Sequence, residues 1–416
     1  MAKLAINGGK KLYLDFFPSQ NTFDIEEQIA VERVIRSNVL TGYRGNYTNN
    51  FFGGAEVKSL EKIWSERFLV KNSIACNSAT SGLQIACGAI GLSTGDEVIV
   101  TPYSMSCSAT APMIYGAVPV FADIEPDYFC LDTEDVKRKI TKKTKAIIVV
   151  DLFGQPHNYE ELKKIAAEYN LKIIEDAAQA LGSTYKKKFS GTLGDIGVYS
   201  FNQGKHITCG EGGMIVTNDS DLALKCRLIM NHAEAVVNEM NHPPQSLKKL
   251  VGFNMRMTEI SAAIIKAQLE KLDGIIAIRK TSAKKFSEYL TEIPAISKTK
   301  TRKNCTNTYY AQAFLWDKDK ADGSHRDIFI RAVKAELMPR EYSISQDVPI
   351  CVGYVKPLYR LPIFDIQKKL CPECEELYND KLFLNLFIAP KITLLDLAIV
   401  KEAFLKCWKY REELKQ

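Results

Sequence analysis

Short apolar runs alternate with segments of helical spacing between about residues 72 and 217, and this alternation constrains the fold more than any other feature. The continuously apolar runs are residues 97–101 (EVIVT), 119–121, 146–150 (AIIVV) and 172–174. The segments with helical spacing are residues 81–92, 133–140 and 159–169. Two more expected strands are residues 196–201 and 213–217. Continuous rather than alternating apolar strands, separated by helices, predict an α/β fold whose mostly parallel central sheet is covered by helices on both faces.

The second half of the chain predicts a smaller α+β domain. A long helical pattern runs from about residue 257 to 290, and we expect it to bridge the two domains. The smaller domain has an expected strand at 309–315, a helix at 326–336 and a closing amphipathic helix from Leu394. The predicted organisation is an N-terminal arm (1–20), a large domain (21–275) and a small C-terminal domain (276–416).

Composition excludes several classes of protein. The net charge of +6 comes from lysines scattered in twos and threes, which indicates solvated faces, and no basic stripe with a nucleic-acid-binding motif is present. No apolar stretch reaches the roughly 18 residues of a membrane span, and the first residues lack the apolar run of a signal peptide. We therefore expect a soluble, cytoplasmic protein with no nucleic-acid or membrane partner.

The cysteines indicate a reducing compartment and no metal site. The chain has 11 cysteines, an odd number, dispersed along the sequence and mostly in apolar surroundings. Cys371 and Cys374 have one half of a zinc-ribbon spacing, but no second pair lies nearby. We interpret these two cysteines as part of a structural turn.

One lysine and one aspartate carry the strongest chemical signal. Lys205 lies between the expected strand 196–201 and the glycine cluster 210–213, and Asp176 follows the expected strand 172–174. In open α/β sheets, ligands bind outside the carboxyl ends of the strands. A lysine held near an electrophile forms a Schiff base, and a carboxylate can pair with the protonated nitrogen of a pyridine ring. Together these residues predict pyridoxal 5′-phosphate, although a surface lysine and an acidic helix cap explain each residue separately.

Further polar residues fit the same cofactor. Residues 76–82 (CNSATSG) follow a short expected strand and open a helix, where backbone amides bind phosphate. Ordinary helix capping explains the same residues. The hydroxyl of Ser200 is a second candidate for the phosphate, and Gln179 is a candidate to meet the phenolic oxygen of the ring.

These motifs, in this order, resemble the sugar aminotransferases of the DegT/DnrJ/EryC1/StrS family, within the fold-type I (aspartate-aminotransferase-like) enzymes that use pyridoxal 5′-phosphate. The resemblance covers nearly the whole chain. It is carried by residues 4–9, 77–81, 116–123, 175–179, 194–195, 200–205, 210–213 and 252–257. It implies that the large domain binds the cofactor.

The resemblance also implies roles for single residues. Lys205 is similar to the lysine that forms the internal aldimine and then moves the proton between cofactor and substrate. Asp176 is similar to the pyridinium partner, and Gln179 to the neighbour of the phenolic oxygen. Ala79, Thr80 and Ser200 match positions that hold the phosphate. Asn254 matches an asparagine that reaches the phosphate in the partner subunit, which implies a homodimer with shared active sites, although a local turn also explains Asn254.

The chain departs from the family pattern at the residue that stacks on the ring. Many relatives have an aromatic side chain there, whereas this chain has Met105, with Tyr103 as the other candidate. A thioether also packs against an aromatic face. In some relatives a histidine replaces the lysine and the enzyme is a dehydratase. Here His206 is only adjacent and Lys205 is retained, which favours amino transfer.

The implied activity is transfer of the amino group of glutamate or glutamine to a keto-sugar, with a nucleotide-linked sugar as the preferred acceptor. Arg44, on the Gly- and Asn-rich loop 40–54, and Tyr310 are candidates for binding the sugar substrate. A surface arginine and a core tyrosine are the plain alternatives. The alternative functions are a keto-sugar dehydratase or lyase with the same cofactor, and an aminotransferase acting on a keto-cyclitol or a sugar phosphate. A non-catalytic regulator is disfavoured because the lysine is present.

Overall fold

A seven-stranded sheet forms the centre of the larger part of the molecule. The computed structural model describes residues 3–240, 242–341, 347–364, 366 and 369–414. The strand order is β1 (Asn72–Cys76), β9 (Gly213–Thr217), β8 (Ile196–Ser200), β5 (Lys172–Asp176), β4 (Thr144–Val150), β2 (Glu97–Val100) and β3 (Val118–Phe121). All pairings are parallel except those of β9, which runs antiparallel to both β1 and β8. The prediction of a mostly parallel sheet is therefore confirmed.

Helices cover both faces of this sheet, as the continuous apolar strands predict. Along β4, Ile148 and Val150 lie in one hydrophobic core, while the alternating Ile147 and Val149 lie in another. The first core includes side chains of α3 (Ala79–Ala89) and α2 (Ala55–Phe68), and the second includes side chains of α5 (Thr133–Lys139) and α6 (Tyr159–Tyr169). Two-sided burial explains why no polar residue interrupts residues 146–150.

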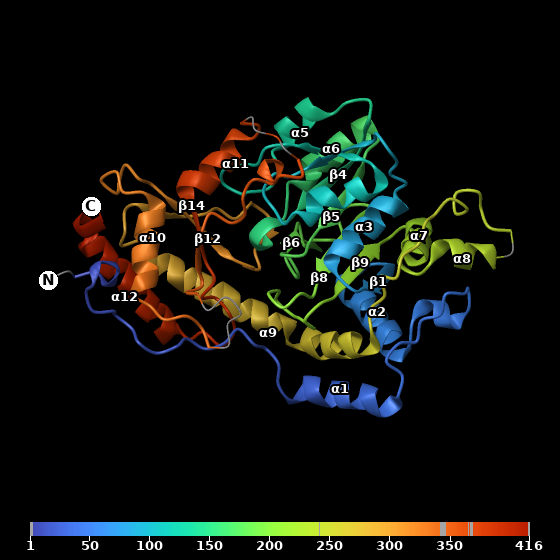
Figure 1. The fold of residues 1–416 in the computed structure, drawn as a ribbon, viewed down its shortest axis with the longest axis horizontal. Helices are drawn as coiled ribbons and strands as arrows, with labels where there is room; N and C mark the ends of the chain where they lie inside the picture. The colour runs from blue at the N-terminus through green and yellow to red at the C-terminus, as the bar shows by residue number, and fades with distance from the viewer. Residues whose placement is uncertain (1–2, 241, 342–346, 365, 367–368, 415–416) are drawn as a thin grey trace.

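The long helix α9 (Glu259–Leu290) connects the two halves of the molecule (Figure 1). Its first part places Leu269 and Leu272 in the core of the large sheet, and its last part places Phe286 and Leu290 in a separate core. That second core also includes residues of α10 (Arg326–Ala335) and α12 (Leu394–Lys409). It packs on an antiparallel sheet in the order β10 (Ile296–Lys298), β12 (Gln312–Trp316), β14 (Leu382–Asn385) and β13 (Ile350–Val352).

The two ends of the chain lie together on the smaller half. Leu4 and Phe17, near the N-terminus, are fully buried in the second core, and Phe17 pairs with Arg340 in a parallel bridge. Helix α1 (Ile25–Ser37) then lies along α9 (Figure 1). The remaining short elements are α4 (Cys107–Thr110), α7 (Ser220–Met230), α8 (Ala233–Asn238), α11 (Pro372–Glu376), β6 (Thr184–Tyr185), β7 (Lys188–Phe189) and β11 (Cys305–Thr306).

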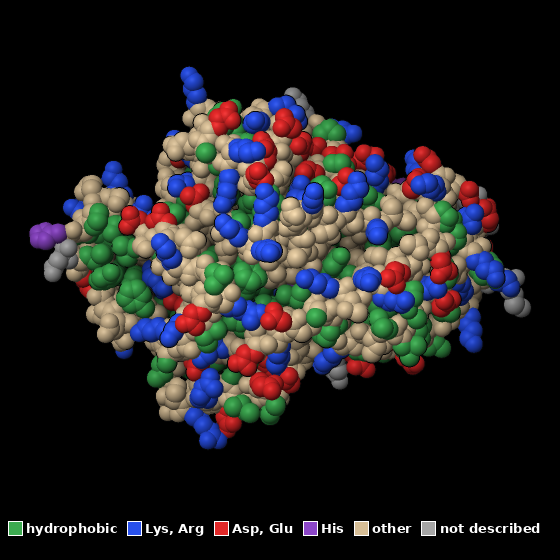
Figure 2. All heavy atoms as spheres, turned by 180° about the vertical axis from the view of Figure 1, so that it is seen from behind, with side chains coloured by type: hydrophobic (Ala, Val, Ile, Leu, Met, Phe, Trp, Pro, Cys, Tyr) green, Lys and Arg blue, Asp and Glu red, His purple; other side chains and the backbone are tan. Residues whose placement is uncertain are grey.

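The expected strand at 309–315 starts later than predicted. Tyr309 has a φ of 52°, which no strand residue adopts, and β12 begins at Gln312. The loop 40–54 contains one short 3₁₀ turn, Asn49–Phe52. Within the described ranges, no helix is both long and apolar enough to cross a membrane. Lysine and arginine side chains are scattered among acidic ones on the face shown in Figure 2.

Candidate active site

The candidate residues gather where several strands of the large sheet end. Asp176 is the last residue of β5, Ser200 is the last residue of β8, and Lys205 follows five residues later. Strand β1 runs parallel to β8, because both are antiparallel to β9, and it leads into α3 at the same edge. The carboxyl ends of these strands therefore build one site, as open α/β sheets generally do.

Asp176 is a buried carboxylate, 4 % exposed, with two donors. It accepts hydrogen bonds from the Ser108 hydroxyl (2.9 Å) and the Ala178 backbone N–H (3.2 Å). Burial raises the pKa of Asp176, whereas the Ser108 hydrogen bond and the positive charge of Lys205 lower it. Lys205 thus lies near enough to Asp176 for its positive charge to lower the pKa of that carboxyl group. The neighbouring Glu175 faces the other way and accepts a backbone N–H from Gly191 (2.7 Å).

Lys205 is half-buried and lies over an aromatic ring. Its Nζ is 4.5 Å from the centroid of the Tyr310 ring, a cation–π contact. Its backbone N–H donates to the Asn202 carbonyl (2.9 Å), which closes the turn after β8. The adjacent His206 is buried, and its Nε2 lies 3.0 Å from the Thr308 carbonyl oxygen. Lys205 and Tyr310 are thus brought together, and the buried His206 ring lies on the same tyrosine, with ring centroids 6.4 Å apart.

The start of α3 offers free backbone donors beside Ser200. The Ser78 hydroxyl accepts from the Ser81 N–H (3.1 Å), as an ordinary helix cap does. Within the described ranges, the N–H groups of Ala79 and Thr80 have no recorded acceptor. Gly213, which pairs with Ser200, allows this approach, because a Cβ there would lie 2.6–2.8 Å from backbone atoms of Ser78 and Ala79. Two free amides and a hydroxyl at one helix start suit a phosphate.

Gln179 is buried, and its carboxamide has a fixed orientation. Its Oε1 accepts from the Phe153 backbone N–H (2.9 Å), and its Nε2 donates to the Tyr354 hydroxyl (2.8 Å). Because only the oxygen of the amide can accept, the bond to Phe153 turns the NH₂ group towards Tyr354. Tyr354 belongs to the same site, because its hydroxyl bonds Gln179 and the negative charge of Asp176 helps to raise its pKa.

The two candidates for the stacking residue differ in exposure. Met105 is 51 % exposed, on the segment that follows β2, whereas Tyr103 is fully buried with its ring edge-on to that of Tyr354 (centroids 5.9 Å apart). Cys107 lies nearby, within electrostatic range of Asp176 and Lys205, and burial raises its pKa to about 11. An unactivated thiol of this kind is not a nucleophile at neutral pH.

Arg44 and Asn254 form a second group. Asn231 donates from Nδ2 to the Arg44 carbonyl (2.8 Å) and pairs with Asn254 in an antiparallel bridge. The Asn254 side chain accepts from Arg256 Nε (2.8 Å). Arg44 and Asn254 are both exposed, and no contact recorded in the described ranges joins either of them to Lys205 or Asp176. The segment that carries Asn254 nevertheless borders the start of α3, because the Asn77 N–H donates to the Met255 carbonyl (2.9 Å) and Cys76 pairs with Arg256 in an antiparallel bridge.

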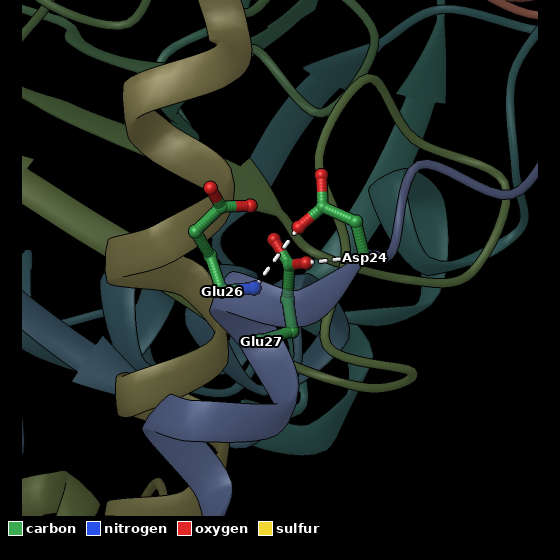
Figure 3. A group of neighbouring side chains, drawn as sticks. All are labelled: Asp24, Glu26 and Glu27. Atoms are coloured by element: carbon green, nitrogen blue, oxygen red, sulfur yellow. Dashed lines mark hydrogen bonds between the residues drawn. The ribbon is translucent and has the colours of Figure 1, made fainter.

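An acidic cluster lies at the start of α1, away from this site. Figure 3 shows the carboxyl groups of Asp24, Glu26 and Glu27 close together beside α9. The ammonium group of Lys271 lies 2.6 Å from Asp24, 3.4 Å from Glu26 and 2.8 Å from Glu27, so this lysine already supplies the positive charge. Elsewhere, Cys371 and Cys374 are buried free thiols at the start of α11, where Asp123 accepts the Cys374 N–H (3.0 Å).

Sequence reasoning missed three residues of the site. Cys107 and Ser108 follow directly after the candidates for the stacking residue but have no predicted role, and none is predicted for Tyr354, on the loop 353–359. Ser108 follows β2, a strand that ends at the same edge of the sheet as β5. This position was a signal for a site residue. Tyr354 had no such signal, because its place depends on how the small half of the molecule docks on the large one.

Comparison with known proteins gives one consistent result. Residues 30–404 match the DegT/DnrJ/EryC1/StrS aminotransferase family. The GDP-perosamine synthase of Caulobacter vibrioides is 43 % identical over 226 residues, which are 54 % of this chain and 59 % of that enzyme. The L-glutamine:2-deoxy-scyllo-inosose aminotransferase of Streptomyces kanamyceticus is 31 % identical over 88 % of this chain and 83 % of that one. The crystal structure of DesI with its TDP-sugar product superposes with a TM-score of 0.83 at 26 % identity, over 99 % of this chain and 98 % of that one.

Proposed function

Because this chain belongs to the DegT/DnrJ/EryC1/StrS aminotransferase family, we propose that it transfers the amino group of glutamate or glutamine to a keto-sugar with pyridoxal 5′-phosphate as its cofactor. The observation that carries the proposal is the position of the buried Asp176 at the end of β5 and of Lys205 just after the end of the adjacent β8, close enough for the lysine charge to lower the pKa of Asp176. An amine and a carboxylate at one edge of the sheet are the two groups that this cofactor requires.

The residues present fit the cofactor. Asp176, pulled towards its ionised form by Ser108 and Lys205, suits the protonated ring nitrogen. The free N–H groups of Ala79 and Thr80, with the Ser200 hydroxyl, suit the phosphate. Gln179 Nε2 donates to the Tyr354 hydroxyl in the same group of residues. When bound, pyridoxal 5′-phosphate would carry the amino group between the two substrates and accept electron density from the reacting carbon.

Lys205 has the central task among the residues of the chain. Its amine would bind the cofactor covalently and, once released, move a proton to or from the reacting carbon of the substrate. The Tyr310 ring beneath the amine limits where the flexible side chain can point. Positioning of this kind is a large part of catalysis, because a proton moves only over hydrogen-bond distances.

For the acceptor we propose a keto-sugar linked to a nucleotide. The support is the names of two similar proteins, a GDP-perosamine synthase and a protein crystallised with a TDP-sugar. A third relative is named for a cyclitol, so a keto-cyclitol is the competing acceptor. Tyr310, in contact with Lys205, is the proposed sugar-binding residue of the same chain. Arg44 is exposed and is proposed to meet an anionic part of the substrate.

We further propose a homodimer in which each site uses residues of both chains. Asn254 is exposed, and its neighbours Met255 and Arg256 contact Asn77 and Cys76 at the end of β1, so its side chain borders the proposed phosphate site and is open to a partner. The outer face of α1 exposes Ile25 (58 %), Ile29 (54 %) and Ile35 (55 %), beside a hollow of about 530 Å³. Hydrophobic side chains also gather at the end of the molecule that carries α8 (Figure 2). Apolar surface of this extent suits a partner of the same chain.

The decisive experiment loads the purified protein with pyridoxal 5′-phosphate and compares Lys205→Ala with the wild type. We expect a visible absorbance band in the wild type, and borohydride reduction should fix the cofactor on the peptide that contains Lys205. Both signals should be lost in K205A and kept in Lys142→Ala, which removes an exposed lysine. Glutamate should then yield 2-oxoglutarate only with an active lysine. A band that persists in K205A would contradict the assigned role.

A further inference from the structure

Two buried arginines lie beside the turn that carries Lys205, and neither has an acidic partner. Arg279, on α9, is 4 % exposed, and Arg340, in the small half of the molecule, is 7 % exposed. Within the described ranges, no ion pair joins either guanidinium group to a carboxylate, whereas the equally buried Arg326 pairs with Asp327 (2.6 Å). A buried charge without a partner is costly, so packing alone does not explain the two groups.

Both guanidinium groups stay charged at neutral pH. Burial lowers the pKa of each to about 10, and the positive charge of Arg279 is a second cause at Arg340. The two groups are therefore close enough to repel each other. An anion that met both would offset the repulsion and the cost of burying the charges.

Arg279 is held on the side of the aromatic neighbour of the lysine. Its Nη1 donates to the carbonyls of Tyr309 (3.0 Å) and Tyr310 (3.4 Å). The Tyr310 ring is the one that lies under the Lys205 amine. The Nε of Arg279 is buried and has no hydrogen-bond partner among the described residues.

Arg340 is held on the side of the backbone of the lysine turn. Its Nη1 donates to Gln20 Oε1 (2.8 Å), and Gln20 Nε2 donates in turn to the carbonyl of Gly204 (3.4 Å), the residue before Lys205. Its Nη2 donates to the Leu386 carbonyl, and its buried Nε has no partner in the described part of the chain. Contacts with neutral groups thus orient both arginines and leave their charge unpaired beside the lysine turn.

A carboxylate is the anion that suits this pair. A guanidinium group presents its N–H groups in a planar fork that matches the two oxygens of a carboxylate. Both groups are more than nine-tenths buried, so the anion that meets them must enter as a small end group. Of the proposed substrates, the amino donor carries such a group, because glutamate and glutamine each have a carboxylate.

We propose that Arg279 and Arg340 bind a carboxylate group of the amino donor and so select an amino acid over a simple amine. The inference rests on the proposed function, because it takes glutamate or glutamine as the donor. The contacts with Tyr310 and, through Gln20, with Gly204 fix where the bound carboxylate lies relative to the Lys205 amine. Correct placement of the donor before proton transfer is the expected benefit.

The test is a calorimetric titration with glutarate, which has two carboxylates like glutamate but no amine. Arg340→Gln should weaken glutarate binding about 30-fold, because hydrogen bonds to a charged group are lost. Arg340→Lys keeps the charge without the planar fork and should lose about tenfold. Arg279→Gln tests the second arginine independently, with the same loss of about 30-fold expected. Equal glutarate affinities in R340Q, R279Q and the wild type would overturn the inference.

Two controls separate this role from a general effect of charge. Arg331→Gln removes an exposed arginine from α10 and should leave glutarate affinity unchanged. A loss in R331Q as large as that in R340Q would reduce the effect to net charge and contradict the site. Thymidine diphosphate should bind R340Q as tightly as the wild type. Weaker diphosphate binding with unchanged glutarate binding would assign the arginines to the sugar nucleotide instead and make the inference wrong.

Kinetics of the first half of the reaction give a second readout. In R340Q the KM for glutamate should rise, while the slow reaction of the bound cofactor with 1-aminobutane keeps its wild-type rate. Equal losses with both amines would show that the substitution only disturbs Lys205, and would overturn the inference. A wild-type protein that shows no visible band with pyridoxal 5′-phosphate would refute the proposed function, whereas a normal band with glutarate affinity unchanged in R340Q and R279Q would refute this inference alone.

Discussion

At the residue scale, the surroundings of Asp176 make cofactor binding depend on pH. The carboxylate must be ionised to pair with a protonated ring, and the hydrogen bond from Ser108 favours that form. Ser108→Ala removes this donor and should raise the pKa of Asp176 by about one unit, since hydrogen bonds to charged groups contribute about 1.5–3 kcal/mol. The pH at which cofactor affinity falls on acidification should therefore be higher in S108A than in the wild type.

Titration of the cofactor-free protein with pyridoxal 5′-phosphate at a series of pH values measures this shift. Ser104→Ala is the control, because Ser104 contacts Ser108 (3.3 Å between hydroxyl oxygens) and has no recorded bond to Asp176. An acid limb that is the same in S108A and in the wild type would show that Ser108 does not set the ionisation of Asp176.

His206 makes stability, rather than binding, depend on pH. Burial lowers its pKa from 6.5 to about 3, so between these values the unfolded chain binds a proton that the folded chain excludes. The stability gained by keeping His206 neutral in the fold is complete above pH 6.5. It is lost as the pH falls from 6.5 towards 3. The free energy of unfolding should fall more steeply than in His206→Gln, by up to about 1.4 kcal/mol per pH unit. Urea denaturation of both proteins from neutral to acid pH checks this, and parallel curves would refute it.

The site residues differ in how far the sequence could predict them. Asp176 and Lys205 could be found because each follows a strand of the parallel sheet, and such strand ends converge. The identity of the stacking residue stays a prediction, since Met105 and Tyr103 both lie on the segment after β2. Tyr354 could not be found, because its contact with Gln179 spans 175 residues of sequence and depends on docking of the two halves.

At the element scale, the close approach of β9 to the start of α3 depends on Gly213. In Gly213→Ala, the added Cβ would lie 2.6–2.8 Å from backbone atoms of Ser78 and Ala79, so the helix start must move. We expect a loss of about 1–3 kcal/mol in the free energy of unfolding and a loss of about tenfold in cofactor affinity.

Gly274→Ala is the matched control for this prediction. Gly274 lies inside α9, and nothing lies within 4 Å of a Cβ placed there. This variant should gain about 0.5–1 kcal/mol from helix propensity and bind the cofactor as the wild type does. Thermal unfolding and cofactor titration give both readouts, and equal affinities in G213A and the wild type would contradict the role of the close approach.

Elements of the large sheet were predictable where burial on both faces leaves a continuous apolar run, as in β4. Helix α1 was not predicted, since its exposed isoleucines break the amphipathic pattern that a monomeric surface helix shows. The antiparallel direction of β9 also could not be read from its composition, because a central strand is apolar whichever way it runs.

At the scale of the whole molecule, the proposed shared sites predict complementation between inactive variants. Lys205→Ala and Asn254→Ala should each lose activity, but a mixed dimer has one site with both residues intact. Refolding equal amounts together should restore about a quarter of wild-type activity, since half the dimers are mixed and each has one working site.

Light scattering should give twice the chain mass of 46.7 kDa for each of these proteins. Mixing K205A with Asp176→Ala is the control, because both residues belong to the same chain's site and no mixed dimer has an intact one. No recovery with N254A would place Asn254 in the site of its own chain, and recovery in the control mixture would show that Lys205 and Asp176 do not act in one chain's site.

Within the described ranges β1 pairs with one strand of the sheet, β9, more than 130 residues later, and its last residue Cys76 also bridges Arg256. During synthesis the first strand to leave the ribosome must therefore wait, unpaired, until nearly the whole sheet has been translated. The helix start that follows β1 is positioned by the same late event. A nascent chain truncated before Gly213 would thus contain every strand of the parallel part of the sheet and still lack an ordered phosphate site.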